Sequence, residues 1–278
     1  MVSRWAGTLK PNNYCNKKIG VVEFMFNYLK DIFSRKKEPV YFITFHKTAS
    51  SYFSKYILKQ TVDFKHSDLA TSIFKNQAVE NINLEQMNTI YGPIRLSLDE
   101  GPVYQRFVEP ILKQKILEKY QIICFIRDPR DIIISYYYSQ AYSHDLSPNS
   151  EIKKIQMKNR KHALEIGIDQ YAIEMADFLN TKFNILIKII KSNDNSILLR
   201  YEDMIYDYDN FYAEINDFIK LKPETKEIIF QNTRPEKKGI NNHRRNGEQG
   251  GYKNELKKET IVSINKKLKN ILYFFKYT

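Results

Sequence analysis

The chain has 278 residues, of which 42% are hydrophobic, and it carries a formal net charge of +12. This length and apolar content suit one large α/β domain, and nothing in the composition requires a second. Two cysteines exclude a disulfide framework, and five scattered histidines offer no metal-ligand spacing. The basic excess suits a polyanionic ligand, but no zinc finger, RNA-binding aromatic signature or long basic helix indicates nucleic-acid binding.

The first predicted element is a helix over residues 21–33, within an N-terminal helical lead-in of residues 1–38. The preceding segment is too polar for a signal peptide. The apolar stretch of the helix contains charged residues and is too short to span a bilayer. The sequence therefore predicts a protein without a membrane anchor, located in the cytoplasm.

A β-prone run over residues 40–45 ends in a lysine that is followed by small and hydroxylic residues, and a helix is predicted over residues 51–60. A strand, a tight loop and a helix in this order direct backbone N–H groups at a bound anion. We name residues 47–52 the cradle; they are Lys47, Thr48, Ala49, Ser50, Ser51 and Tyr52. The cradle departs from the Walker loop, in which glycines precede the lysine. The alternative is an ordinary turn whose helix is capped by Ser50 or Ser51.

The elements predicted after the cradle are a short strand at 61–64, a helix near 80–90, a strand at 93–98 and a helix at 103–118. Asp99 and Glu100 follow the second of these strands, and His66 follows the first. Because the carboxyl ends of parallel strands are where open α/β sheets bind ligands, these residues are candidates for a site.

A second informative stretch begins with an apolar strand predicted at 121–126 and continues with Arg127 and Pro129. A helix is predicted over 131–141 with Asp131 as its N-cap, which places Ser135 about one turn inside it. The guanidinium of Arg127 offers a planar fork of donors that suits a phosphate. The alternative is that Arg127 pairs with Asp128 or Asp131 and only stabilises the loop.

The remaining predicted elements are a loop at 143–149, helices at 150–166 and 168–191, a strand at 196–200, and helices at 209–220, 224–232 and 253–272. Strands that alternate with helices predict a parallel sheet covered on both faces. Residues 243–254 contain three of the nine glycines beside arginines and a lysine. A basic, glycine-rich loop lets backbone and guanidinium groups approach an anion closely.

Together these stretches resemble the sulfotransferases that use 3′-phosphoadenosine 5′-phosphosulfate (PAPS). The family's phosphosulfate loop resembles residues 47–52, and its R-[DN]-P-[RK]-D-x-x-x-S-x-Y motif resembles residues 127–137. Its L-x-Y-E-D-[LM] segment resembles residues 199–204, and its closing glycine-rich loop resembles residues 245–254. The matches follow the family's order and span residues 40–256.

The resemblance implies a single α/β domain over residues 1–278, with a central parallel sheet, flanking helices and a P-loop-like cradle. It implies that residues 233–256 close over the nucleotide and that no metal is required. The cofactor-binding residues implied are the six cradle residues with Arg127, Ser135, Tyr201, Arg245, Asn246 and Gly247. Lys47 is expected to neutralise the charge that develops on the leaving phosphate.

The general base is where the sequence departs from the cytosolic branch of the family, because the histidine expected after the third strand is absent. Other branches use a carboxylate, so Asp99 or Glu100 is the expected substitute; the alternative is helix capping ahead of Pro102. His66 is a second candidate for the base, and His46 is interpreted as a loop residue that orients the cradle.

The acceptor predicted by the resemblance is a hydroxyl or amine of a small molecule, bound by residues from 64–80 and 139–165. Two other functions remain open. One is a P-loop phosphotransferase, which needs glycines before Lys47 and a magnesium-binding acid. The other is a catalytically inactive protein that binds PAP, the desulfonated nucleotide, or a nucleic acid. The sequence does not indicate the oligomeric state.

Overall fold

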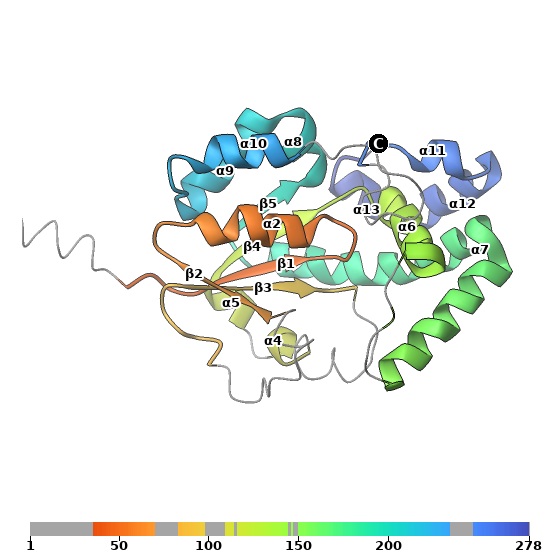
Figure 1. Ribbon diagram of the computed structural model, residues 1–278, viewed down its shortest axis with the longest axis horizontal. Coiled ribbons are helices and arrows are strands. Elements are labelled where there is room, and N and C mark those ends of the chain that lie inside the picture. Colours follow the sequence, from red (N-terminus) through yellow and green to blue (C-terminus); the bar gives the residue numbers. More distant parts are fainter. Residues whose placement is uncertain are drawn as a thin grey trace, which may run out of the picture. The chain divides into compact units, whose positions relative to one another are not determined.

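The computed structural model describes residues 36–69, 83–97, 109–113, 116–143, 146, 150–233 and 247–277 (Figure 1). Residues 38–278 form one compact unit, separate from residues 1–37. The helix predicted over 21–33 lies outside the described residues.

A parallel sheet forms the centre of this unit. Its strands, within the described part of the chain, are β1 Val40–Thr44, β2 Lys65–Asp68, β3 Thr89–Arg95, β4 Gln121–Ile126 and β5 Ser196–Arg200. Their order across the sheet is β2-β3-β1-β4-β5, and every neighbouring pair is parallel. The strand β1 is therefore central, with β3 on one side and β4 on the other. Such a switch point is where open α/β sheets bind ligands, beyond the carboxyl ends of the strands.

Helices cover both faces of the sheet, as predicted. They are α2 Ser50–Tyr56, α4 Glu109–Lys113, α5 Ile116–Lys119, α6 Pro129–Tyr138, α7 Ser150–Lys191, α8 Tyr201–Tyr206, α9 Tyr208–Ile219, α10 Thr225–Thr233, α11 Tyr252–Glu255, α12 Lys258–Lys267 and α13 Lys269–Phe274, with a 3-10 turn η1 Leu58–Gln60 and a π-helical turn η4 Ser139–Ser143. Helices α2, α9 and α10 lie on one face, and α4, α5 and α7 on the other (Figure 1).

The apolar core follows the alternation of side chains along β1. Val40 and Phe42 pack toward the α2 face, while Tyr41 and Ile43 pack toward the α7 face. The ring of Phe42 stacks on Phe53 of α2, with centroids 4.7 Å apart. Burying a side chain of this size stabilises the fold by about 1.5–3 kcal/mol. This packing fixes α2 to the sheet and so sets the position of the loop between β1 and α2.

The pairing of β1 with β3 contains a bulge. Tyr41 pairs with Tyr91, but Ile43 pairs with Ile94, so β3 has one residue more than β1 between these two pairs. Gly92 lies in the bulge, where a Cβ would come 2.6 Å from the carbonyl oxygen of Phe42. No real Cβ approaches a backbone oxygen so closely, which explains why this position is glycine.

Several boundaries differ from those predicted. The strand expected at 61–64 is wrong: the strand is β2, and Thr61 makes only an isolated bridge with Leu221. The helix expected near 80–90 is also wrong over its described part, where residues 83–88 form turns and β3 then begins. Two asparagines explain these turns. The side chain of Asn83 accepts a hydrogen bond from the backbone amide of Glu85, and Asn88 has a left-handed backbone conformation.

The long helices agree with the sequence more closely. Helix α7 is kinked at Gly167, whose φ is 71°, and this confirms the two helices predicted at 150–166 and 168–191. The strands predicted at 121–126 and 196–200 are confirmed with their bounds. The single helix predicted over 253–272 is instead α11, α12 and α13. Leu256 and Lys257 are extended between the first two, and the backbone of Leu268 is not helical between the last two. Helix α8 was not predicted.

Candidate anion-binding site

The cradle connects β1 to α2 without a glycine. Lys47 and Ala49 both have left-handed backbone conformations, with φ of 66° and 60°. Such conformations cost on the order of 1–3 kcal/mol per non-glycine residue, and they persist only where surrounding contacts enforce them. Ala49 is the N-cap of α2, and no side chain caps this helix. The alternative of a turn capped by Ser50 or Ser51 is therefore wrong.

Two threonine hydroxyls brace the cradle from beneath. Thr44 and Thr48 are fully buried, and their Oγ1 atoms lie 2.7 Å apart. Thr48 donates to the carbonyl oxygen of Phe45 at 2.8 Å, and Thr44 donates to that of Phe125 at 2.7 Å. Because these bonds tie the loop to the end of β4, they supply the contacts that the strained backbone requires. The hydroxyl of Thr48 thus serves the loop itself.

Arg127 follows β4 and lies against the cradle. Its side chain is 7% exposed, and Nη1 donates to the carbonyl oxygen of Lys47 at 3.3 Å. Its guanidinium lies over the ring of Tyr201, 4.6 Å from the centroid. The buried Nε has no hydrogen-bond partner. Arg127 forms no ion pair with Asp128 or Asp131, so that alternative is wrong; Asp128 pairs with Arg130 instead.

A third cation, Arg95, was not predicted to belong to the site. It is the last residue of β3, and its Nε and Nη2 donate to Oγ of Ser50 and Ser51 at 3.2 and 3.4 Å. Burial lowers the pKa of this guanidinium, although nearby Asp68 and Tyr136 partly oppose the effect. Arg95 was overlooked because the strand was predicted to run to residue 98, which placed it inside the strand. A strand end at Arg95 is the signal that finds it.

These three cations affect one another. Burial, followed by the charges of Arg127 and Arg95, lowers the pKa of Lys47 to about 8. Among the described residues, no acidic side chain forms an ion pair with Lys47, Arg95 or Arg127. Asp68 acts on Arg95 and Asp131 acts on Arg127, both without an ion-pair contact. Clustered like charges are costly, and a bound polyanion would stabilise all three. The residues present therefore fit an anionic ligand.

The segment 199–204 and the described end of the glycine-rich loop are linked to Arg127 through Tyr201. Tyr201 is the first residue of α8, and its hydroxyl donates to the carbonyl oxygen of Gly247 at 3.0 Å. Arg127 thus contacts the cradle on one side and Tyr201 on the other, and Tyr201 leads to the described end of the glycine-rich loop. Arg245 and Asn246 lie outside the described residues. Ser135 is half-buried on α6.

Tyr52 is packed within the fold. Its hydroxyl donates to the carbonyl oxygen of Ile229 in α10 at 2.8 Å, and its ring lies 4.9 Å from that of Tyr56. These contacts attach α2 to α10. The role of Tyr52 in binding the cofactor, which the family resemblance implies, stays a prediction.

The candidates for a general base are not all placed near the cradle. Asp99 and Glu100 lie outside the described residues. His66 lies within β2 opposite Ile90, five residues before Arg95 along β3. Because of the bulge, Ile90 and Arg95 pair with residues of β1 that are only four positions apart, about 13 Å along the sheet, and this separation places the backbone of His66 away from Arg95. Its Nε2 lies 3.0 Å from the carbonyl oxygen of Gly92, which requires a protonated Nε2.

His46 makes a denser set of contacts than a loop residue usually has. Its backbone N–H donates to Ser97 Oγ at 2.8 Å, and its Nδ1 lies 3.0 Å from the same oxygen. The hydroxyl of Tyr136 on α6 lies 3.3 Å from both the Oγ and the carbonyl oxygen of Ser97. The rings of His46 and Tyr136 meet edge to face, with centroids 5.8 Å apart. The carboxyl ends of β1 and β3 and the last turn of α6 are joined here.

Next to Arg127, the remaining charges of the motif are satisfied by the protein. Asp128 caps α6 by accepting from the Arg130 amide; Asp131, predicted as the cap, lies in the first turn. The Asp131 carboxylate instead accepts from the amides of Gly250 at 2.7 Å and Tyr252 at 3.1 Å. The guanidinium of Arg130 bonds to Asp128 and to the carbonyl oxygen of Tyr277 at 2.6 Å. These bonds hold the C-terminal helices against α6.

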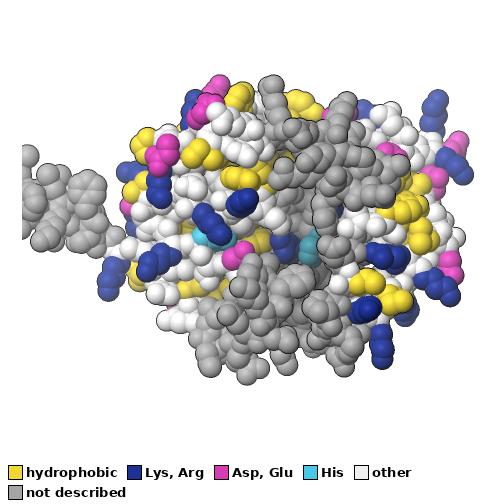
Figure 2. Space-filling model, in the orientation of Figure 1, with side chains coloured by type: hydrophobic (Ala, Val, Ile, Leu, Met, Phe, Trp, Pro, Cys, Tyr) yellow, Lys and Arg dark blue, Asp and Glu magenta, His cyan; other side chains and the backbone are white. Residues whose placement is uncertain are grey.

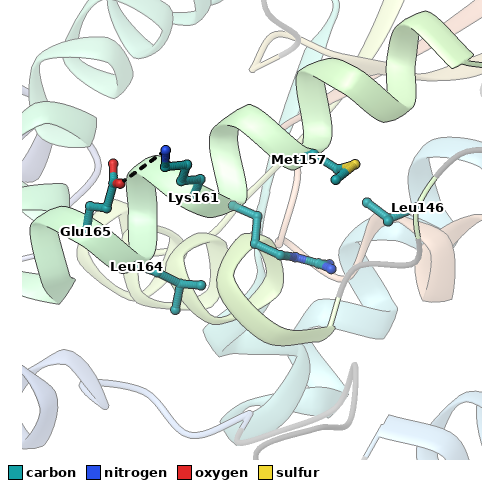
Figure 3. Close-up of a pocket in the computed structure, with 6 residues that line it drawn as sticks. Leu146, Met157, Lys161, Leu164 and Glu165 are labelled. Atoms are coloured by element: carbon teal, nitrogen blue, oxygen red, sulfur yellow. Dashed lines mark ion pairs between the residues drawn. The ribbon is translucent and has the colours of Figure 1, made fainter.

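An open pocket of about 430 Å³ lies over the first half of α7 (Figure 3). Apolar side chains of Leu146, Met157 and Leu164 line it together with Arg160, while Lys161 and Glu165 pair with each other at 3.6 Å. Arg160 also donates to the carbonyl oxygen of Gln140 in η4, the turn that follows α6. The pocket therefore lies on one of the two segments predicted to bind the acceptor.

Within the described residues, no group of three or more His, Cys, Asp or Glu side chains is arranged to hold a metal ion. The helices in this part of the chain include none long and apolar enough to cross a membrane. Lys and Arg side chains are spread over the visible face rather than gathered in one patch (Figure 2). Most of the basic excess on this face thus belongs to solvated surface.

Comparisons with known proteins agree with this geometry. The family described as sulfotransferase domain matches residues 37–273. The crystal structure of mouse sulfotransferase SULT7A1 complexed with PAP has a TM-score of 0.52 at 13% identity, over 87% of this chain and 86% of that chain. The crystal structure of retinol dehydratase with retinol and PAP has a TM-score of 0.45 at 14% identity, and it covers 88% of this chain and 86% of that chain. The structure of retinol dehydratase with androsterone and PAP has a TM-score of 0.44 at 15% identity, and it covers 88% of this chain and 85% of that chain. No sequence among the curated proteins matches the chain. The likeness to the mouse structure confirms the predicted parallel α/β fold.

Proposed function

The chain belongs to the sulfotransferase domain family, and on that premise we propose that its donor substrate is PAPS. The proposed acceptor is a hydroxyl or amine of a small molecule. The observation that carries the proposal is the meeting of Lys47, Arg95 and Arg127 beside the cradle, where none of them forms an ion pair with an acidic side chain among the described residues. The structural neighbour from mouse contains PAP, which agrees with this donor.

The residues of the site fit the two ends of such a donor. When bound, PAPS supplies the sulfuryl group and a phosphate leaving group. We propose that the cradle with Lys47, Ser50 and Ser51 holds the 5′-phosphosulfate, and that Arg127 and Ser135 hold the 3′-phosphate. The unpartnered Nε of buried Arg127 supports this role, because a buried donor without an acceptor costs about 1–3 kcal/mol until one is provided.

Lys47 is proposed to hold positive charge where the leaving phosphate becomes more negative. A preorganised charge in a site that excludes water stabilises a transition state more than a ground state. The left-handed backbone at Lys47 and the bond from Arg127 to its carbonyl fix the start of this side chain. Arg95 is proposed to hold the cradle serines and to add a second charge nearby.

Other parts of the proposal come from the sequence and the family resemblance. They are the roles of Thr48, Ala49, Tyr52, Tyr201, Arg245, Asn246 and Gly247 toward the nucleotide, the closure of residues 233–256 over it, a single domain over residues 1–278, catalysis without a metal, and a cytoplasmic location. The bond between Tyr201 and Gly247 supports a role for the loop, because it attaches the described end of the loop to Arg127.

Isothermal calorimetry tests the donor. We expect PAP to bind with a Kd of about 1 µM or lower, near −8 kcal/mol, in EDTA as well as in Mg²⁺. ATP with Mg²⁺ is the matched control, because it also carries a phosphate chain on adenosine. Binding of ATP–Mg²⁺ without binding of PAP would contradict the assignment and favour a phosphotransferase. Salt-sensitive binding of DNA without PAP would instead favour a nucleic-acid-binding protein.

For the acceptor, we propose that the pocket over α7 contributes to binding, because its lining is mostly apolar and it adjoins the turn after α6. Labelled PAPS with a panel of phenols, alcohols and amines tests the class of acceptor. Replacing Leu164 by Ser should raise the KM for an apolar acceptor and leave PAP affinity unchanged. An unchanged KM for every acceptor of the panel would exclude the pocket.

A further inference from the structure

Behind the anion-binding site, the segments that carry Arg127 and Tyr201 are tied together by Tyr277, which follows α13 and is 3% exposed. We propose that Tyr277 is a positioning residue for binding of the 3′-phosphate: it fixes Arg127 against Tyr201 and acts through the neighbours of this pair. The inference rests on the proposed function, in which Arg127 holds that phosphate. Tyr277 belongs to none of the motifs by which the chain resembles its family.

Tyr277 makes hydrogen bonds to both segments at once. Its hydroxyl donates to Oε2 of Glu202 at 3.0 Å, and its carbonyl oxygen accepts from Nη2 of Arg130 at 2.6 Å. Glu202 follows Tyr201 directly, and Arg130 lies three residues after Arg127. The side chain and the backbone of one residue therefore connect the residues that follow β5 with those that follow β4.

These two contacts belong to a closed ring of hydrogen bonds. Oε1 of Glu202 accepts from the backbone amide of Asp128 at 2.9 Å, and the carboxylate of Asp128 accepts from Arg130 at 2.7–3.2 Å. Arg130 in turn donates to Tyr277, and Tyr277 donates to Glu202. All of these bonds are buried. A buried polar network whose members are satisfied is rigid, so the ring holds its residues in one arrangement.

The ring fixes the residues directly beside the pair that is proposed to bind phosphate. Asp128 follows Arg127, and Glu202 follows Tyr201. The guanidinium of Arg127 lies over the ring of Tyr201, 4.6 Å from its centroid. Because one peptide unit joins each residue to its neighbour, a displacement of either carboxylate-bearing residue moves the backbone of the residue before it. Binding groups misplaced by about 1 Å lose much of their effect, so this rigidity matters for the ligand.

One oxygen of Glu202 depends on the hydroxyl of Tyr277. Glu202 is 3% exposed, and burial raises the pKa of its carboxyl, whereas the bonds from the Asp128 amide and from Tyr277 oppose this rise. Loss of the hydroxyl would leave Oε2 buried without this donor, which is costly. The carboxylate also attracts the guanidinium of Arg200, which lies over the ring of Tyr277, 4.5 Å from its centroid. We expect the freed carboxylate to turn toward Arg200 and to weaken its bond to the Asp128 amide.

Tyr277→Phe tests the proposal, because it removes the hydroxyl and keeps the ring and the carbonyl oxygen. Calorimetry should show PAP bound about tenfold more weakly than by the wild type, within the range by which residues outside a site modulate affinity. Adenosine 5′-phosphosulfate, which lacks the 3′-phosphate, should bind both proteins equally. The matched control is Tyr91→Phe: Tyr91 is 1% exposed near the amino end of β3, and its hydroxyl donates to the carbonyl oxygen of Asn83. The control should lower the urea midpoint and leave both affinities unchanged.

A double-mutant cycle shows whether Tyr277 acts through Arg127. In the Arg127→Met background, Tyr277→Phe should change the affinity for PAP by less than about twofold, because the group that it positions is gone. A tenfold loss in both backgrounds would overturn the proposal. So would parallel losses for PAP and adenosine 5′-phosphosulfate, or a Tyr277→Phe protein that binds PAP as the wild type does.

A readout without nucleotide separates this inference from the function on which it rests. The Nε–H signal of Arg127 in an arginine ¹⁵N spectrum depends on the place of the guanidinium over the ring of Tyr201, because an aromatic ring shields the protons above its face. Arg127→Met identifies the signal. Tyr277→Phe should shift it and Tyr91→Phe should not, and an unshifted signal in Tyr277→Phe would overturn the proposal. Failure of the wild type to bind PAP, with the signal shifted as expected, would contradict the proposed function alone.

Discussion

Arg127 and Arg130 stand three residues apart in one motif, both nearly buried, yet their surroundings are opposite. Arg130 bonds to both oxygens of Asp128 at 2.7–3.2 Å, to Asn265 at 3.2 Å and to the carbonyl oxygen of Tyr277, and lies over the ring of Tyr252. Arg127 bonds only to the carbonyl oxygen of Lys47 among the described residues, leaves Nε without a partner, and lowers the pKa of a neighbouring lysine.

The difference shows how a buried charged side chain that stabilises the fold can be distinguished from one that is available to bind a ligand. A structural charge finds its counter-charge and acceptors inside the protein, as Arg130 does. A binding charge is held in place by contacts that leave its donors unused, as the ring of Tyr201 holds Arg127. Four experiments test whether this contrast holds, beginning with the one of largest expected effect.

Arg130→Met should destabilise the fold by about 3–5 kcal/mol, because it leaves the carboxylate of Asp128, 2% exposed, without its partner. Arg127→Met, the matched control, should cost little, since it breaks no ion pair. Urea denaturation of both variants without ligand measures the difference. Equal losses would mean that Arg127 is structural too.

Lys47→Ala should lower kcat by about 10²–10³-fold, the scale for removing one preorganised group that stabilises developing charge. PAP affinity should fall only moderately, because PAP lacks the sulfuryl group that Lys47 is proposed to face. Lys55→Ala, an exposed lysine on α2, is the control. A Lys47→Ala enzyme with near-normal kcat would reduce Lys47 to a residue of the turn.

Arg127→Ala should weaken PAP binding by about 1.5–3 kcal/mol, the scale for a charged hydrogen bond, and we expect the same of Arg245→Ala. Adenosine 5′-phosphosulfate, which lacks the 3′-phosphate, should bind both variants nearly as well as the wild type. Calorimetry with the two nucleotides makes the comparison. Parallel losses for both would show that neither arginine contacts the 3′-phosphate.

The smallest effect concerns stability without ligand. Because the pKa of Lys47 is lowered to about 8, against about 10.4 in an unfolded chain, the unfolded state binds more protons between these values. Stability from this group therefore rises with pH across that window, and the cost of its buried charge is largest below about pH 8.

Lys47→Met should accordingly be more stable than the wild type by about 1–2 kcal/mol near pH 7, and the gap should close by about pH 10. Urea denaturation at both values measures it, with Lys55→Met as control. A gap that persists at the higher pH would have another cause.

The sequence predicted best what local patterns determine. The apolar run of β4 gave correct bounds because this strand is buried on both faces from Ile122 to Ile126. The bounds of β5 were also correct, although most of its residues are only half-buried. Gly167 separated the two halves of α7 because a left-handed residue interrupts a helix. Residues 83–88 were misjudged because side-chain to backbone bonds of Asn83 outweighed helical periodicity.

The candidate site was partly predictable for the same reason. The cradle and Arg127 each belong to a local sequence motif at the end of a strand. Their proximity therefore followed from the order of the strands in the sheet. The contacts of Arg95 with the cradle serines, and the contact of His46 with Ser97, join residues that are separated by 44 to 51 positions in the sequence. Such contacts are determined by strand register, and the hydrophobic pattern of β3 did not reveal its extra residue.

That extra residue decides which side chains line the site. Side chains alternate between the faces of a strand, so one inserted residue exchanges the faces of all that follow. Before the bulge, even-numbered Ile90 packs on the α2 face; after it, even-numbered Ile94 and Leu96 pack on the α7 face. Arg95 thereby gains the α2 face and its serines. Without the bulge, the same sequence would place Ile94 and Leu96 on the α2 face and turn the guanidinium of Arg95 away from the cradle serines, whereas deletion of one bulge residue would leave Arg95 opposite Thr44.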